Sequence, residues 1–353
     1  MRRRHTLYLS LGLLGWGITA CHNSPSPESS PLVQPAGAKD ITIKGAGASF
    51  PARLYQKWAM EFNKIYPHIL CQYQPVGSRA GITQFMAGLV DFGASDVPML
   101  DREVAKVGRG ALMLPMTAGA VVFAYNLGSI TNLYLSRASY INIWLGKITR
   151  WNDPAILKDN PNLNLPDLEI TLFYRSDDSG TTEILTRHLS AISKEWRNSL
   201  GTGRKVAWRR GTGVRGNEGI SAEIQRRVGS IGFVEYSYAL QNKLSIAKLQ
   251  NRAGAMVTAD MDSQIHALAR ISLKDNLVGI EPDPLGDDSY PIVAYTWLLV
   301  YRQYPTPAQG AGMKTFLQWA LSTGQTFSSD LGYIPVPNNV IGQVSASIEQ
   351  IQE

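Results

Sequence analysis

Three stretches of the sequence place hydroxyl residues in a turn between a strand-like run and a helix-like run. They are residues 45–51 (GAGASFP), 77–81 (GSRAG) and 177–182 (DDSGTT). In each case the following apolar residues recur at helical spacing, as with Leu54, Trp58 and Phe62 after the first turn. The unpaired backbone N–H groups at a helix N-terminus attract anions, and hydroxyl groups add donors. Each turn alone is equally explained as ordinary helix capping, but three together can converge on one small oxyanion.

Two charged residues near these turns narrow the ligand chemistry. Arg175 precedes the third turn and supplies a guanidinium, a group well suited to tetrahedral oxyanions. Asp96 ends the short apolar run at residues 91–96, and a carboxylate beside an anion is favourable only if the anion carries a proton to donate. Phosphate carries such a proton at neutral pH and sulfate does not, so the pattern favours phosphate.

The length, composition and net charge of the chain limit its fold class and its binding partners. The 353 residues are 44% hydrophobic, which predicts a substantial core and about two domains. The net charge of +6 includes Arg2, Arg3 and Arg4, and without them 31 basic residues face 28 acidic ones. Such a mild excess predicts no nucleic-acid binding. Short β-rich runs alternate with amphipathic helical patterns after residue 41, which indicates an α/β fold.

The N-terminal residues have the pattern of a bacterial lipoprotein. A basic start is followed by an apolar run at residues 7–20 that is too short to span a bilayer, and Cys21 comes directly after it. We expect residues 1–20 to be a signal peptide, Cys21 to be lipidated and residues 21–39 to be a flexible tether; the alternative is an ordinary signal peptide with an incidental cysteine. Cys71 then has no partner, and we expect it to be a small buried residue.

Taken jointly, the motifs resemble the substrate-binding proteins of the bacterial phosphate-specific ABC transporters. The resemblance runs from about residue 41 to the end of the chain, through GAGASFPARLYQKW, PVGSRAGITQFMAGLVDFGASD, LGKITRWNDPAI, YRSDDSGTT and GSIGFVEYSYA. It implies phosphate ligands at the positions that match the family motif: Ser49, Phe50 (backbone N–H), Ser78, Asp96, Arg175, Ser179, Gly180 (backbone N–H) and Thr181. It also implies that Asp177 orients the binding arginine.

The same resemblance implies a two-lobed periplasmic-binding-protein fold of type II, with two hinge crossovers and the ligand in the cleft between the lobes. Lobe 1 would comprise residues 40–124 and 292–353, and lobe 2 residues 125–291, with crossovers near residues 123–126 and 290–295. Arg79 and Asp178 depart from the family pattern. Arg79 would either add an outside charge or fold away, and Asp178 would cap its helix with its side chain toward solvent.

The function implied is capture of inorganic phosphate outside the cytoplasmic membrane and delivery to a phosphate ABC permease, by a monomeric, membrane-anchored lipoprotein in the periplasm or at the cell surface. The alternatives are a phosphate sensor or scavenger, and a phosphate-ester hydrolase. The five scattered histidines show no metal-ligand spacing, so we expect no metal, no cofactor and no catalysis. The GTGVRG stretch at residues 211–216 fits a dinucleotide-binding pattern, but a lone match is weak and we reject it.

Overall fold

One long strand, β4 (Ala111–Asn126), belongs to both halves of the main sheet in the computed structural model, which describes residues 41–352. Residues 111–120 of β4 pair antiparallel with β12 (Val293–Tyr301), and residues 121–126 pair antiparallel with β8 (Ser230–Glu235). The strand order is β2-β1-β3-β12-β4-β8-β6-β7, with the short β9 (Ser245–Ile246) also on β4. We call the part from β2 to residue 120 the first half-sheet, and the part from residue 121 to β7 the second half-sheet.

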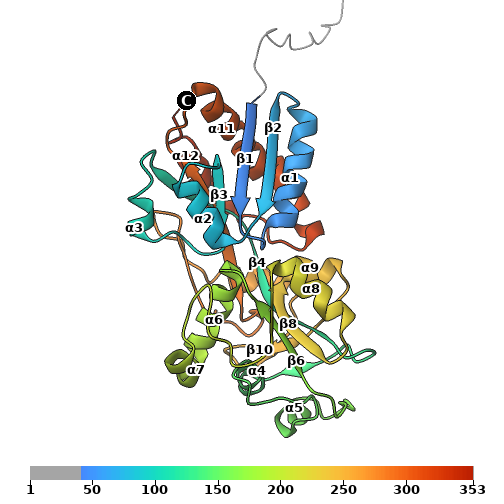
Figure 1. The fold of residues 1–353 in the computed structure, drawn as a ribbon. Helices are drawn as coiled ribbons and strands as arrows, with labels where there is room; N and C mark the ends of the chain where they lie inside the picture. The colour runs from blue at the N-terminus through green and yellow to red at the C-terminus, as the bar shows by residue number, and fades with distance from the viewer. Residues whose placement is uncertain (1–40, 353) are drawn as a thin grey trace, which may run out of the picture. The chain divides into compact units, whose positions relative to one another are not determined.

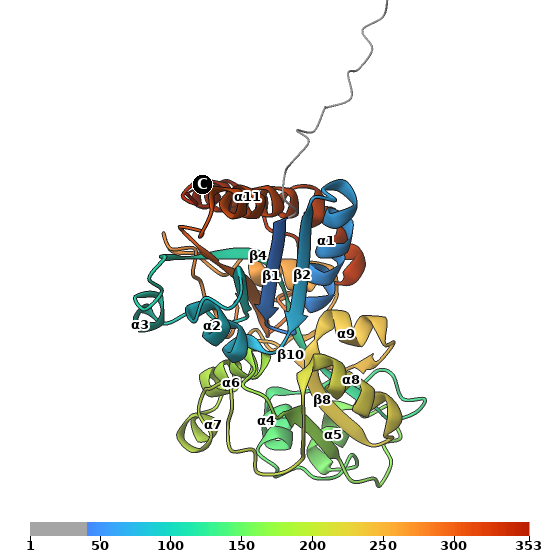
Figure 2. The same ribbon diagram turned by 45° about the horizontal axis from the view of Figure 1, so that its top comes forward.

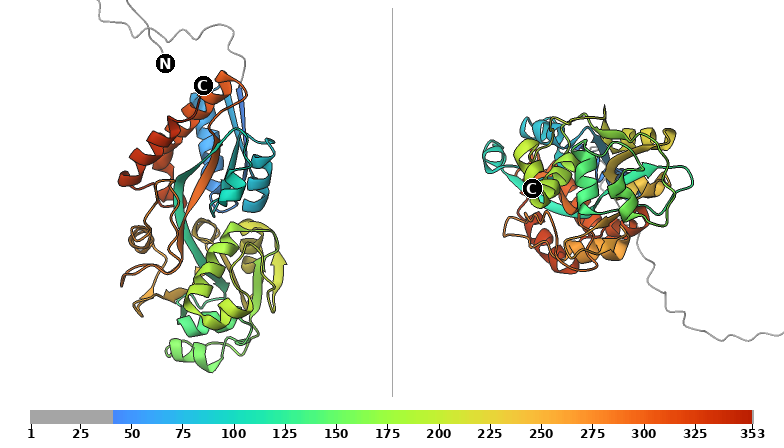
Figure 3. Two further views of the ribbon diagram at one scale, coloured as in Figure 1. Left: turned by 90° about the vertical axis from the view of Figure 1, so that its left-hand side faces the viewer. Right: turned by 90° about the horizontal axis from the view of Figure 1, so that it is seen from below.

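The first half-sheet is built from alternating strands and helices. Its parallel strands are β1 (Ile41–Gly47), β2 (Ile69–Pro75) and β3 (Phe92–Ser95). The apolar stripe of α1 (Ala52–Ile65) buries Leu54, Trp58 and Phe62 against the sheet, as the helical spacing predicts. α1 and α11 (Pro307–Leu321) cover one face, and α2 (Ser78–Met86) covers the other (Figures 1 and 3).

The second half-sheet adds two parallel strands beside β8. They are β6 (Thr171–Arg175) and the edge strand β7 (Thr212–Val214). α8 (Gly216–Arg226) packs on β8, with α9 (Tyr236–Gln241) beside it (Figure 2), and α6 (Gly180–Ile192) follows β6. The remaining elements are α3 (Asp101–Val104), β5 (Tyr134–Leu135), α4 (Arg137–Trp144), α5 (Pro154–Asp159), α7 (Lys194–Ser199), β10 (Lys248–Gln250), β11 (Met256–Val257), α10 (Met261–Leu268), two 3₁₀ turns (Thr323–Phe327 and Ser329–Leu331) and α12 (Asn338–Ile348).

The α/β class predicted from the sequence is confirmed, and so are the strands and helices around all three hydroxyl turns. The pairing of β4 changes between Ala120 and Val121, slightly before the expected crossover region at residues 123–126. Cys71 is buried in β2, and burial raises the pKa of its thiol. The segments expected to be a signal peptide and a tether, with Cys21 between them, lie outside the described residues. Within residues 41–352, no helix has the length and apolarity needed to cross a membrane.

Candidate functional site

The three hydroxyl turns meet where the parallel strands of the two half-sheets end. Ser49 follows β1, Ser78 begins α2, and Ser179, Gly180 and Thr181 lie at the start of α6. All five residues are buried. The carboxyl ends of parallel strands are the usual place for a ligand in open α/β sheets, because loop and helix N-terminal N–H groups gather there.

Hydrogen bonds join groups from the two half-sheets directly. The Gly180 N–H donates to Ser78 Oγ at 3.2 Å, and Ser78 Oγ lies 3.3 Å from Asp96 Oδ2. Thr181 Oγ1 also lies 3.5 Å from Asp96 Oδ2. A Cβ atom on Gly180 would lie only 2.4 Å from Ser78 Oγ, so only glycine permits this approach. Four of the predicted ligand residues, Ser78, Asp96, Gly180 and Thr181, therefore form one cluster.

Asp96 is the most constrained group of this cluster. Its side chain is 2% exposed, and Thr296 Oγ1 donates to its Oδ1 at 3.1 Å. Burial raises the pKa of Asp96 to about 7, although the Thr296 hydrogen bond and the charge of Arg175 act in the opposite direction. A carboxyl group with a pKa near neutrality beside hydroxyl donors can accept a proton from a ligand or hold one itself.

Arg175 is held by Asp177 at the end of β6. Its Nε donates to Asp177 Oδ1 at 2.8 Å, its Nη2 donates to Asp177 Oδ2, and its Nη1 lies 3.4 Å from Thr181 Oγ1. Partial burial disfavours ionised Asp177, but the hydrogen bond and charge of Arg175 hold the pKa of Asp177 below its usual value. Arg175 itself is 2% exposed, so its charge acts in a poorly hydrated place, where it attracts an anion strongly.

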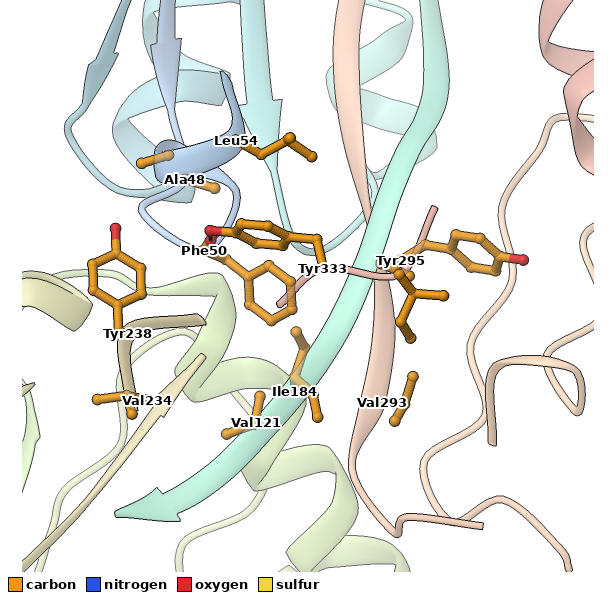
Figure 4. Packing of buried hydrophobic residues seen from close by; sticks show 14 of the residues in the cluster. Ala48, Phe50, Leu54, Val121, Ile184, Val234, Tyr238, Val293, Tyr295 and Tyr333 are labelled. Atoms are coloured by element: carbon orange, nitrogen blue, oxygen red, sulfur yellow. Dashed lines mark hydrogen bonds between the residues drawn. The ribbon is translucent and has the colours of Figure 1, made fainter. Parts of the chain in front are cut away.

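Three tyrosine hydroxyls fix the backbone of the first turn. Tyr73 donates to the carbonyl oxygen of Ala48 at 2.5 Å, Tyr238 to that of Ser49 at 2.7 Å, and Tyr333 to that of Phe50 at 2.8 Å. In a planar trans peptide the N–H points opposite to the carbonyl, so the Tyr238 bond also fixes the direction of the Phe50 N–H. Figure 4 shows the Phe50 ring packed near Tyr333, and the ring is fully buried.

The structure decides between the capping and binding interpretations of Ser49 and corrects the expected cap of α6. Pro51, not Ser49, is the N-cap of α1, so Ser49 Oγ does not cap that helix. Ser179 rather than Asp178 caps α6, because Ser179 Oγ accepts from the Thr182 N–H at 3.2 Å; the Asp178 side chain is exposed, as expected. Arg79 folds toward α3, where its Nη1 pairs with Glu103 Oε1 at 2.7 Å.

Sequence reasoning missed four residues that contact the predicted ligand residues, one of which is Tyr333 at the Phe50 carbonyl. The other three act at Asp96 and Ser49. They are Thr296, which holds Asp96, Tyr238, which holds the Ser49 carbonyl, and Asn217, which contacts Ser49. Asn217 directly follows the GTGVRG stretch, in which Gly211 precedes β7, Gly213 lies within it and Gly216 begins α8. A polar residue just inside a helix N-terminus beside a glycine turn was the available signal.

Glu235 is a second buried carboxyl group beside the cluster. Its side chain is fully buried, its Oε2 accepts from the Ser237 N–H at 3.0 Å, and its Oε1 has no partner among the described residues. Burial raises the pKa of Glu235 to about 8, because the charged form loses its hydration.

The raised pKa of Glu235 predicts a pH-dependent cost in stability. The folded state binds this proton more tightly than the unfolded state, so the contribution of Glu235 to stability falls as pH rises from about 4.5 through about 8. We expect Glu235→Gln to raise Tm relative to the parent protein at pH 8.5, with the difference vanishing near pH 4.5. Thermal unfolding of both proteins across this range measures it, and a difference independent of pH would contradict the assignment.

No group of three or more His, Cys, Asp or Glu side chains suited to a metal ion occurs within residues 41–352. The site consists of hydroxyl and backbone N–H donors, the positive charge of Arg175 and the carboxyl group of Asp96.

Residues 33–323 match the family model described as a PBP superfamily domain. The phosphate-binding protein PstS of Xylella fastidiosa strain Temecula1 is 38% identical over 344 residues, covering 93% of this chain and 93% of the relative. PstS of Pasteurella multocida is 40% identical over 310 residues, covering 86% and 89%. The chain belongs to the family of PstS phosphate-binding proteins. The family resemblance predicted from the motifs is thus confirmed.

Solved structures confirm the fold expected of the PstS family. The phosphate-binding protein from Stenotrophomonas maltophilia superimposes with a TM-score of 0.70 at 20% identity, covering 87% of this chain and 93% of that one. This likeness supports the periplasmic-binding-protein fold of the chain. The relatives from both comparisons carry the name of binding proteins.

Proposed function

We propose that the protein binds inorganic phosphate reversibly, outside the cytoplasmic membrane, and delivers it to the permease of a phosphate ABC transporter. The observation that carries the proposal is the buried cluster in which Arg175, the donors of both half-sheets and Asp96 meet. Membership of the PstS family supports both the ligand and the transporter. We propose binding without covalent chemistry, which agrees with the names of the relatives, since both are called phosphate-binding proteins.

Each predicted ligand residue has a role in this proposal. Arg175 supplies the positive charge, and hydroxyl groups donate from Ser49, Ser78, Ser179 and Thr181. Backbone N–H groups donate from Phe50 and Gly180. Asp96 accepts the proton of the ligand, which excludes an anion without one. Asp177 keeps the guanidinium of Arg175 in place through its two bonds.

We further propose two lobes, with residues 40–124 and 292–353 in lobe 1 and residues 125–291 in lobe 2. Each lobe contains most of one half-sheet, and residues 121–124 of β4, which pair with β8, lie at the crossover. The hinge would then consist of the shared strand β4 and the second crossover, near residues 290–295, which leads into β12. Hydrogen bonds between the half-sheets, such as Asn217 Nδ2 to Ser49 Oγ, would form as the lobes close, whereas the Gly180 N–H would exchange Ser78 Oγ for a phosphate oxygen. A lipid anchor at Cys21, preceded by a cleaved signal peptide, would hold this monomeric body at the membrane through the tether at residues 21–39.

Calorimetric titration of the body, starting at Lys39 and stripped of ligand, tests the proposal. We expect one phosphate to bind tightly per molecule and sulfate at the same concentration to give no heat of binding. If neither anion binds, the proposed ligand is wrong, and hydrolysis of a phosphate ester is the assay to run next. Tight binding of sulfate would contradict the role given to Asp96.

A further inference from the structure

Asn217 is a buried amide at the point where the two half-sheets meet. It is the second residue of α8, is 0% exposed and lies on the second half-sheet side of the cluster. Its Nδ2 lies 3.1 Å from Oγ of Ser49, which follows β1 of the first half-sheet, and 3.4 Å from Oγ1 of Thr181 in α6. One side-chain amino group thus contacts two of the hydroxyls proposed to bind phosphate.

The orientation of this amide is fixed by the backbone. The Glu235 N–H donates to Asn217 Oδ1 at 3.2 Å, and an N–H can only donate, so the oxygen of the amide must face β8. The NH₂ group must then face Ser49 and Thr181. Because NH₂ only donates, both hydroxyl oxygens act as acceptors toward Asn217.

A hydroxyl oxygen that accepts a hydrogen bond can still donate its own hydrogen, which then points away from the group that donates to it. Ser49 Oγ accepts from Asn217 Nδ2 and, at 3.4 Å, from the Asn217 backbone N–H. Thr181 Oγ1 accepts from Asn217 Nδ2 and Arg175 Nη1. Both hydroxyl hydrogens are therefore directed away from Asn217, and that of Thr181 points toward Asp96 Oδ2, 3.5 Å away.

We propose that Asn217 is a positioning residue that fixes Ser49 and Thr181 as hydrogen-bond donors toward the bound oxyanion. The inference rests on the proposed phosphate function and deepens it. An anion accepts hydrogen bonds only, so a hydroxyl whose hydrogen points elsewhere would present a lone pair to it. In the closed form the amide of Asn217 removes that unfavourable arrangement, so neither hydroxyl presents a lone pair to the ligand.

Two substitutions separate this role from simple packing. Asn217→Ala removes the side-chain amide and leaves Ser49 only the backbone N–H of residue 217, and Thr181 only Arg175, as donors. The two hydroxyls are then held less firmly, and we expect phosphate affinity to fall by about 10-fold. Asn217→Asp keeps the shape but replaces the donor by an acceptor that draws both hydroxyl hydrogens away, and we expect a loss of about 100-fold or more at pH 8.5. Protonation restores a donor, so the Asn217→Asp defect should shrink toward that of Asn217→Ala at pH 5.

The titration is run on the parent and both variants at each pH, and each variant is compared with the parent at the same pH. Asp96, Asp177 and Glu235 face this region together with the charge of Arg175, and all four are unchanged in the parent and Asn217→Ala. In Asn217→Asp the new carboxylate also repels Asp96 and Glu235, so this variant is read against the double-mutant cycle with Ser49→Ala. Asn160→Ala is the matched control. It removes a buried amide with three hydrogen bonds to Tyr134 and Ile156, and it should leave phosphate affinity unchanged.

A double-mutant cycle with Ser49→Ala distinguishes orientation from charge repulsion or loss of fold. If Asn217 acts through the Ser49 hydroxyl, the penalty of Asn217→Ala is several-fold smaller in the Ser49→Ala background. An unchanged penalty, or an Asn217→Asp defect equal to that of Asn217→Ala at both pH values, overturns the inference. Failure of the parent protein to bind phosphate would instead overturn the proposed function, so the two failures are distinguishable.

Discussion

Replacement of Arg175 by lysine is expected to weaken phosphate binding by at least about 100-fold, although the positive charge is kept. The guanidinium of Arg175 donates to both oxygens of Asp177 and also reaches Thr181, and a single ammonium group cannot hold all these positions. Lysine would leave part of the Asp177 carboxylate unpaired in a half-buried place, close to the anion. Calorimetric titration with phosphate measures the loss.

Arg137→Lys is the control for this substitution. Arg137 makes a similar two-pronged pair, with Nη1 and Nη2 donating to Asp283 at 3.1 and 2.6 Å, but it does not contact the cluster. We expect Arg137→Lys to lower thermal stability slightly and to leave phosphate affinity unchanged. Equal affinities of Arg175→Lys and the parent would show that the charge alone suffices and that the geometry set by Asp177 is dispensable.

The second large effect concerns selectivity rather than affinity. Asp96→Asn replaces an acceptor by a group that can also donate, with little change in shape, so sulfate no longer meets an unpaired carboxylate. We expect sulfate to bind the variant and the preference for phosphate over sulfate to fall by about 100-fold or more. Titrating each anion against the parent and the variant measures both affinities.

The pH profile of the parent protein gives the same test without a mutation. Because burial raises the pKa of Asp96 to about 7, this carboxyl group becomes protonated as pH falls through neutrality and can then donate. Sulfate affinity of the parent should therefore rise as pH falls below about 7, whereas that of Asp96→Asn should not. Asp91→Asn, which changes a part-buried carboxyl group bonded to the Lys44 N–H, should leave the preference intact. A preference unchanged in Asp96→Asn would contradict proton reading by Asp96.

Local patterns predicted much of this architecture because the site lies where strands turn into helices. The hydroxyl turns, Arg175 and Asp96 are visible in the sequence since each lies within a few residues of a predictable strand end or helix start. Asn217, Tyr238 and Thr296 act through contacts with residues far away in sequence, as Thr296 does with Asp96. Such contacts depend on how the half-sheets meet, and no local spacing encodes them.

The N-cap of α6 differs from the predicted one by a single residue. Asp178 and Ser179 are adjacent, and both residue types are good N-caps, so composition does not decide between them. The backbone decides, because the Ser179 N–H is bonded to the Arg204 carbonyl at 2.9 Å and leaves the serine hydroxyl at the helix start. Arg79 likewise pairs with Glu103, a partner that only the position of α3 supplies.

The place of β12 in the sheet has a consequence for how a newly made chain folds. β3 and β4 are consecutive in sequence, yet β12 lies between them and pairs with both. In a growing polypeptide, β3 and β4 are therefore made long before β12, residues 293–301, which must pair between them. Thr296, the partner of Asp96, arrives with the same late strand. An unfinished chain thus lacks a complete anion site, and phosphate can stabilise the fold only after nearly the whole protein has been synthesised.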